Sequence, residues 1–184
     1  CAMNLCLLAC TNEDKRFKYL STRQTGIDFQ NTITETPEFN ILNFHYIYNG
    51  GGVGVGDFNK DDLPDLVFSG NEVSSKIYLN QGNLKFQDVS EEANLVTNVW
   101  VTGVSIVDID ANGWEDIYFS DGGLNCEVAC LNLLFLNQGL DEKGIPQFKE
   151  AAADFNLDDG LYTQQALFFA YDGDDDLDVY LLHN

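Results

Sequence analysis

The sequence has few basic residues and very few histidines. Of its 184 residues, 9 are Lys or Arg and 30 are Asp or Glu, so the formal net charge is −21 and the isoelectric point is near 4.1. A chain this acidic repels phosphate groups, which argues against binding to DNA or RNA. The only histidines are His45 and His183, which gives little support for a His-based nucleophilic or zinc site. These scarcities direct attention to the acidic residues.

Long apolar runs are absent as well, because no stretch approaches the roughly 18 to 20 residues of a transmembrane helix. The chain is nevertheless 45% hydrophobic and 12% aromatic, enough to bury a core, which excludes a disordered acidic tail. Asp outnumbers Glu by 20 to 10. Asp favours caps, turns and metal loops, whereas Glu favours helices, so the composition indicates a β-rich protein with acidic loops.

Three acidic windows repeat along the chain, at residues 57–65, 108–116 and 170–178. Short runs of small or β-branched residues precede the first two windows (52–56 and 102–107), and β-branched or aromatic runs follow all three (66–68, 117–119 and 179–181). A further apolar run at 77–79 or 133–136 comes before an Asn-Gln-Gly turn. All-β repeats of 50 to 60 residues predict β-propeller blades, here over about 45–95, 96–157 and an incomplete 158–184.

In the first two acidic windows, oxygen-bearing side chains occupy positions 1, 3, 5 and 9, and the third window keeps positions 3, 5 and 9. The carbonyl at position 7 can complete a shell. Hard oxygen ligands in this number suit Ca²⁺, which takes six to eight. The candidate ligands are Asp57, Asn59, Asp61, Leu63 and Asp65 in loop one, Asp108, Asp110, Asn112, Trp114 and Asp116 in loop two, and Asp172, Asp174, Asp176 and Asp178 in loop three. Ala170 replaces the first ligand of loop three, so we expect two calcium sites and a weaker third. Solvated turns are the alternative.

Two other loop motifs do not fit. An EF-hand needs a bidentate Glu at position 12, where this sequence has Phe68, Phe119 and Leu181. The glycines of residues 50–56 have no following Lys-Ser/Thr, which a phosphate-binding loop requires. Asp62 and Asp175 occupy the position where Gly usually makes the sharp turn, and Asp tolerates the left-handed conformation better than most residues.

The unit of strand, Asp-x-[Asp/Asn]-x-[Asp/Asn]-Gly-x-x-Asp and strand resembles the FG-GAP/VCBS repeat of integrin α-subunit propellers. Residues 49–59 and 74–82 are more similar to bacterial FG-GAP/VCBS lipoproteins related to cartilage acidic protein, many of which end in an ASPIC/UnbV domain. The resemblance covers about residues 45–184. It implies an exported, calcium-stabilised propeller, usually seven-bladed, that is used for binding, and this chain would supply about two and a half blades.

The N-terminus carries a second resemblance, because Leu7-Leu8-Ala9-Cys10 is similar to a bacterial lipobox. Residues 1–10 are therefore expected to be a truncated lipoprotein signal with Cys10 as the lipidated residue, and a short buried apolar segment is the alternative. Residues 11–44 form a polar lead-in that either crosses the propeller or adds a strand to it. Cys126 and Cys130 lack the partners of a zinc site, and either a local disulfide or two free thiols fits them.

Together these features predict a non-enzymatic module, lipid-anchored at the bacterial outer membrane, that binds a surface protein or a glycan and uses calcium structurally. Its membrane contact would be through the lipid only. Two alternatives remain open. The chain could be the accessory or substrate-binding segment of a larger polysaccharide-active enzyme, or a structural spacer.

Overall fold

The computed structural model describes residues 17–123, 131–174 and 176–183. The predicted signal segment 1–10 with Cys10, and the pair Cys126 and Cys130, lie outside the described residues. No helix in the described ranges is long and apolar enough to cross a membrane.

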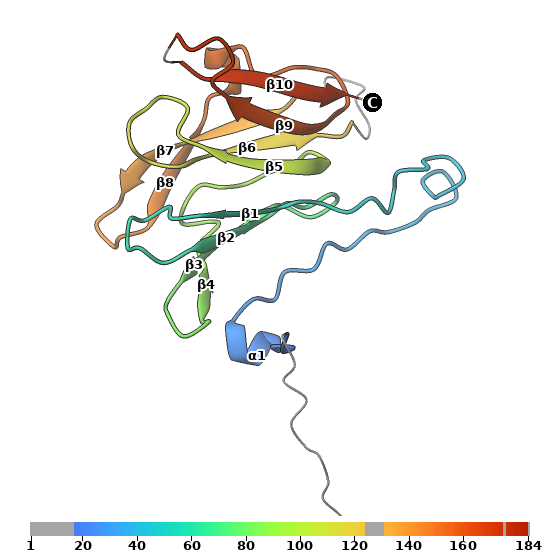
Figure 1. The fold of residues 1–184 in the computed structure, drawn as a ribbon. Helices are drawn as coiled ribbons and strands as arrows, with labels where there is room; N and C mark the ends of the chain where they lie inside the picture. The colour runs from blue at the N-terminus through green and yellow to red at the C-terminus, as the bar shows by residue number, and fades with distance from the viewer. Residues whose placement is uncertain (1–16, 124–130, 175, 184) are drawn as a thin grey trace, which may run out of the picture.

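Three antiparallel sheets follow one another along the chain, as the propeller prediction requires (Figure 1). The first consists of β1 (Val53–Gly56), β2 (Asp65–Phe68), β3 (Lys76–Asn80) and β4 (Phe86–Asp88). The second consists of β5 (Val101–Val107), β6 (Asp116–Asp121), β7 (Leu133–Leu140) and β8 (Pro146–Glu150). The third pairs β9 (Thr163–Phe169) with β10 (Asp178–His183). Each four-stranded sheet is a simple meander, which is the arrangement of a propeller blade.

Small residues allow the first strands of neighbouring blades to approach closely. A Cβ on Gly54 of β1 would lie 2.8 Å from Cδ1 of Ile106 in β5, and one on Gly52 would lie 3.1 Å from the backbone nitrogen of Val104. The glycines before the first acidic loop therefore serve packing between β1 and β5, as the small residues of this strand predict.

The hydrophobic core lies between the sheets. Phe58, Val67 and Ile77 of the first blade are fully buried in one cluster with Phe119 and Phe135 of the second. A second cluster joins the opposite face of the second blade to the third sheet; it contains Tyr118, Leu134, Leu136, Ala151, Ala152 and Ala166. The 3₁₀ turn Ala152–Phe155 follows β8 and belongs to this second interface. Because the side chains of a strand alternate between two faces, the second blade packs against the first blade with one face and against the third sheet with the other.

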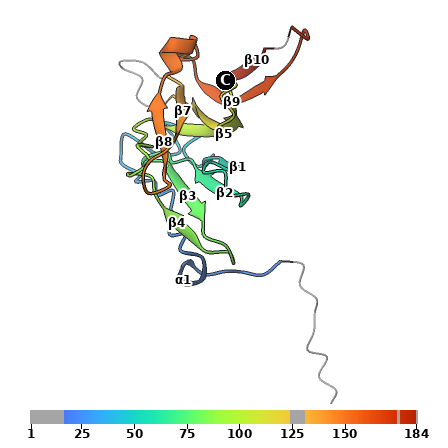
Figure 2. The same ribbon diagram turned by 90° about the vertical axis from the view of Figure 1, so that its left-hand side faces the viewer.

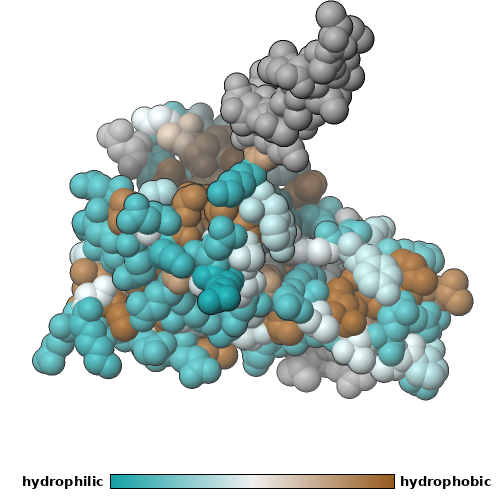
Figure 3. All heavy atoms as spheres, turned by 90° about the horizontal axis from the view of Figure 1, so that it is seen from below, coloured by the Kyte–Doolittle hydropathy of each residue, from teal (hydrophilic) through white to brown (hydrophobic). Residues whose placement is uncertain are grey.

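The described part of the lead-in, from residue 17 onward, adds no strand to the first blade. After the one-turn helix α1 (Thr22–Thr25), which lies beside β4, it runs along the face of the first blade that points away from the second (Figures 1 and 2). The Phe29 ring stacks on Phe68 with 5.4 Å between centroids, and the Tyr78 hydroxyl donates to Asp28 Oδ1 at 2.9 Å. Hydrophilic atoms cover most of the surface on this side of the molecule (Figure 3).

Candidate metal centre

The three acidic loops lie at the same end of their blades, on the left in Figure 1. Loop one (57–65) connects β1 to β2, loop two (108–116) connects β5 to β6, and loop three (170–178) connects β9 to β10. Each loop therefore joins the first two strands of its sheet. This equivalence allows the loops to be compared position by position.

Position nine is a buried carboxylate in the first two loops. Asp65 accepts the backbone N–H of Phe58 at 3.1 Å on Oδ2 and that of Asn80 at 2.7 Å on Oδ1. Asp116 repeats this pattern, with the donors Ile109 at 3.0 Å and Asn137 at 2.8 Å. Both carboxylates have no exposed surface. Each ties the start of its loop to the third strand of its own blade.

Burial also changes the acidity of these two side chains. Loss of solvation raises the pKa of Asp65 and of Asp116 to about 6, although the two backbone donors on each carboxylate lower it. The acidic neighbours at positions 1 and 5 of loop one, and at positions 1 and 3 of loop two, raise it further. A negative charge at position nine is therefore costly unless a cation lies nearby.

Position one closes each of these loops from the other side. Asp57 accepts the N–H groups of Asp61 at 3.1 Å and Asp62 at 2.9 Å. Asp108 accepts those of Asn112 at 3.1 Å and Gly113 at 2.9 Å. The first carboxylate thus holds the middle of the loop in a tight turn.

Positions three and five form successive Asx turns, in which a side-chain oxygen accepts the N–H two residues on. Asn59 accepts from Asp61 at 3.3 Å, and Asp61 accepts from Leu63 at 2.9 Å. The same contacts in loop two join Asp110 to Asn112 at 3.2 Å and Asn112 to Trp114 at 2.7 Å. The predicted carbonyl positions, Leu63 and Trp114, therefore follow the last Asx turn of each loop.

The backbone is left-handed at positions four and six. Asp62 has φ +64°, which confirms the turn expected where the repeat usually has Gly, and Gly113 has φ +84° at the matching position of loop two. Lys60 and Ala111, at position four, are also left-handed, with φ of +58° and +54°. Non-Gly residues pay roughly 1 to 2 kcal/mol for this conformation, so the loop contacts must hold it in place.

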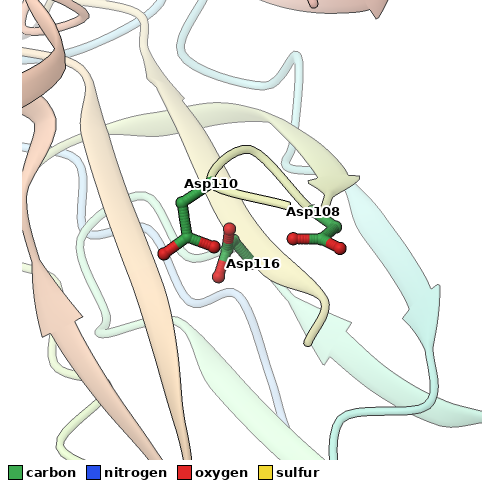
Figure 4. A group of neighbouring side chains, drawn as sticks. All are labelled: Asp108, Asp110 and Asp116. Atoms are coloured by element: carbon green, nitrogen blue, oxygen red, sulfur yellow. The ribbon is translucent and has the colours of Figure 1, made fainter. Parts of the chain in front are cut away.

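In loop two the carboxylates converge. Asp108, Asp110 and Asp116 each offer one oxygen, and these oxygens all lie within 4.8 Å of one another (Figure 4). No other group of three acidic, His or Cys side chains among the described residues comes this close together. With the Asn112 amide oxygen and the Trp114 carbonyl in the same loop, the donors are all hard oxygens, so the residues present fit Ca²⁺.

Loop one has the same turns with a different donor set. Its third position is the amide Asn59, whose Nδ2 donates to Asp61 Oδ2 at 3.0 Å. Its three candidate carboxylate ligands are therefore at positions 1, 5 and 9, and they do not form the close group that loop two shows in the described part of the chain.

Loop three is held by fewer contacts. Asp178 accepts the N–H of Tyr171 at 2.7 Å, which reproduces the first contact of Asp65 and Asp116. Asx contacts join Asp172 to Asp174 at 3.3 Å and Asp174 to Asp176 at 3.4 Å. Asp176, hydrogen-bonded to Asp174, has a raised pKa. Within the described residues, the third sheet has no strand to supply the second donor to Asp178.

Two asparagines in the third strands belong to the site although their role was not predicted. The backbone N–H groups of Asn80 and Asn137 hold Asp65 and Asp116, and their side chains cap the following glycines, Gly82 and Gly139. The signal was present in the sequence as the repeated Asn-Gln-Gly, which indicated only a turn.

Comparison with known families supports this description of the repeat. No curated protein matched the chain in a sequence comparison. Residues 57–119, which run from the first acidic loop through the second and into β6, match the family model of the FG-GAP-like repeat.

Proposed function

We propose that this chain is a calcium-stabilised segment of an exported β-propeller that binds a protein or a glycan at the cell surface and has no catalytic role. The observation that carries the proposal is the convergence of Asp108, Asp110 and Asp116. None of the three carboxylates makes an ion pair with a basic side chain in the described residues. A bound divalent cation would supply that missing charge.

Calcium in this proposal is structural. The candidate ligands lie on the hairpins that join the first two strands of each blade, so a cation would fix these hairpins and the strands next to them. Since Asp116 is anchored to β7 through Asn137, ordering loop two would also stabilise the second blade. Binding to the folded state alone raises stability by about 2.7 kcal/mol at 100 times the dissociation constant.

The test is thermal unfolding in calcium and in excess chelator, together with calorimetric titration of the metal-free protein. We expect chelation to lower the melting temperature by several degrees. Asp110→Asn should reduce both the calcium affinity and this difference. Asp154→Asn is the matched control, because that carboxylate is exposed and its one ion pair within the described ranges is with Lys149. An unchanged melting temperature in chelator would contradict the structural role of calcium.

The opposite end of the blades offers a place for a ligand. A cavity of about 710 Å³ lies between the lead-in and the loops after β2 and β4; its lining includes Thr34, Phe39, Asn71, Asn98 and Trp100. Hydroxyl, amide and aromatic groups are those that contact sugars and polar peptides, and Glu72 disfavours an anionic ligand there. Binding is tested on glycan and surface-protein arrays with wild type and Asn98→Trp, which places a large side chain at the lining of the cavity. Turnover of a glycan by the chain would contradict the non-catalytic role.

Anchoring through Cys10 completes the proposal and is supported by the lipobox resemblance alone. Growth with a labelled fatty acid should label the full-length protein and not the Cys10→Ser variant. Protease treatment of intact cells then reports whether the protein faces outward. Equal labelling of the variant would contradict the anchor without affecting the calcium site.

A further inference from the structure

The first and second acidic loops belong to different blades, yet one chain of buried hydrogen bonds joins them. Asp65 accepts the N–H of Phe58 at 3.1 Å, and the carbonyl of Phe58 accepts Nδ2 of Asn137 at 3.0 Å. The backbone N–H of Asn137 donates to Asp116 at 2.8 Å. The side chains of Phe58 and Asn137 are fully buried, so water does not compete with these contacts.

Two more contacts cross between the same loops. Glu115, next to the ligand Asp116, accepts the backbone N–H of Asp57, which is position one of loop one. Lys60 Nζ lies 3.9 Å from the centroid of the Trp114 ring. Asn112 also donates to the Asn137 carbonyl at 3.3 Å. Three residues of loop one are therefore linked to the second blade. Asp57 and Lys60 contact loop two directly, and Asp65 is linked to Asn137 through Phe58.

Asn80 shows which contacts of Asn137 lie within a single blade. It occupies the same position in the first blade, donates its N–H to Asp65 at 2.7 Å and accepts from Gly82 at 2.9 Å. Its Nδ2 donates to Pro64 in its own loop at 2.8 Å, as Asn137 does more weakly to Glu115 at 3.4 Å. Asn137 also reaches the loop of the preceding blade, whereas no blade precedes that of Asn80 among the described residues.

We propose that Asn137 is a positioning residue that couples the two loops, so that a divalent cation in one loop raises the affinity of the other. Fixing Asp116 on a cation fixes the backbone of Asn137, and its carboxamide then holds the Phe58 carbonyl. The N–H of Phe58 is thereby held against Asp65, the buried ligand of loop one. By linkage, a cation in loop one strengthens loop two by the same factor. The inference rests on the proposed calcium function.

The test uses Tb³⁺ as the cation and its luminescence sensitised by tryptophan. Trp114 belongs to loop two and its ring also lies beside Lys60 of loop one, whereas Trp100 lines the cavity at the other end of the blades. The signal therefore reports the two acidic loops together, and Asp108→Asn, which disables loop two, gives the contribution of loop one. Asp61→Asn disables loop one. We expect it to weaken Tb³⁺ binding at loop two by about fivefold or more, at the lower end of ordinary coupling factors.

The decisive comparison is a double-mutant cycle. Asn137→Ala should remove most of the factor caused by Asp61→Asn, because the link to Phe58 is gone and only the Glu115 and Lys60 contacts still join the loops. Asn80→Ala, which loses equivalent contacts within its own blade, should leave the factor unchanged. A purely structural role of Asn137 would lower the affinity of loop two and keep the factor. That result, or a factor of one in the wild type, would overturn the coupling while the calcium sites stand.

A second variant keeps the test possible if Asn137→Ala does not fold. Glu115→Ala removes only the contact with the Asp57 N–H and should reduce the factor partially. Hydrogen exchange gives a readout on loop one itself. Adding Tb³⁺ to the Asp61→Asn variant should slow hydrogen exchange of the Phe58 amide. It should not slow this exchange in the double variant that also carries Asn137→Ala. If Tb³⁺ and Ca²⁺ bind nowhere, both the calcium proposal and the coupling fail.

Discussion

Loops two and three differ in how the carboxylate at position nine is held. Loop three has the most aspartates, five in its nine residues, whereas loop two has three. Yet Asp116 of loop two is fully buried with two backbone donors, and Asp178 of loop three is only partly buried with one. The extra donor comes from β7, whose counterpart the third sheet lacks among the described residues. The contacts that hold the position-nine carboxylate thus follow the neighbouring strand and not the number of carboxylates in the loop.

Removing the position-nine carboxylate should give the largest effect and the sharpest contrast. Asp116→Ala leaves the N–H groups of Ile109 and Asn137 buried without an acceptor, at about 1 to 3 kcal/mol each. We expect Asp116→Ala to lower the free energy of unfolding by about 3 kcal/mol, and Asp178→Ala to lower it by about 1 kcal/mol. Urea denaturation in chelator measures both variants without any contribution from calcium. Equal losses would show that β7 adds nothing to loop order.

The strands and turns around the loops could be predicted from the sequence, because the relevant signals are local. Alternating ligands, the Gly or Asp at position six and the apolar runs beside each loop are short-range patterns. They placed the strands around the loops and the turn at Asp62 correctly.

The remainder depends on contacts between distant segments. Asn137 reaches Phe58 across 79 positions of sequence, and Phe29 of the lead-in stacks on Phe68. Neither partner can be identified from periodicity, since no local pattern records which faces pack together. The difference between loops one and two in carboxylate convergence likewise follows from side-chain placement, although both have the predicted spacing.

Restoring the missing ligand of loop three would test the comparison from the other side. Ala170→Asp supplies a carboxylate at position one, where Asp57 and Asp108 hold the middle of their loops. In chelator the added charge should destabilise the protein. At about 100 times the dissociation constant, calcium should add about 2.7 kcal/mol and one more bound ion. Calorimetric titration counts the sites. A stoichiometry that does not rise would show that loop three needs a third strand as well.

The pH dependence of stability should reverse with calcium. The pKa values of Asp65 and Asp116 are about 6 in the folded protein, above the ordinary value of 3.8. Between these values the folded state holds protons that the unfolded state has released, so in chelator stability rises as the pH falls through about 6. Calcium competes with those protons, so its stabilisation should weaken over the same window. Melting temperatures across pH, with and without calcium, test this.

A matched variant distinguishes the pH dependence caused by the acidic loops from that caused by another buried acid. Burial also raises the pKa of Asp121 to about 6, and this residue lies at the end of β6, outside the acidic loops. Asp121→Asn should remove its part of the acid stabilisation and leave the calcium dependence intact. If calcium did not change the pH profile at all, Asp65 and Asp116 would not be ligands.

Position six should give the smallest effect and isolate backbone strain from metal binding. Asp62 and Gly113 have nearly the same left-handed backbone, but Asp62 has a Cβ that disfavours it. Asp62→Gly relieves this strain, and the greater freedom of Gly in the unfolded chain offsets part of the gain. We expect a net stabilisation of about 0.5 kcal/mol, and a loss of about 1 kcal/mol for the reverse change Gly113→Asp. Because neither side chain is a predicted ligand, chelator should not alter these differences in urea denaturation. A calcium-dependent difference would instead assign Asp62 a direct electrostatic role in loop one.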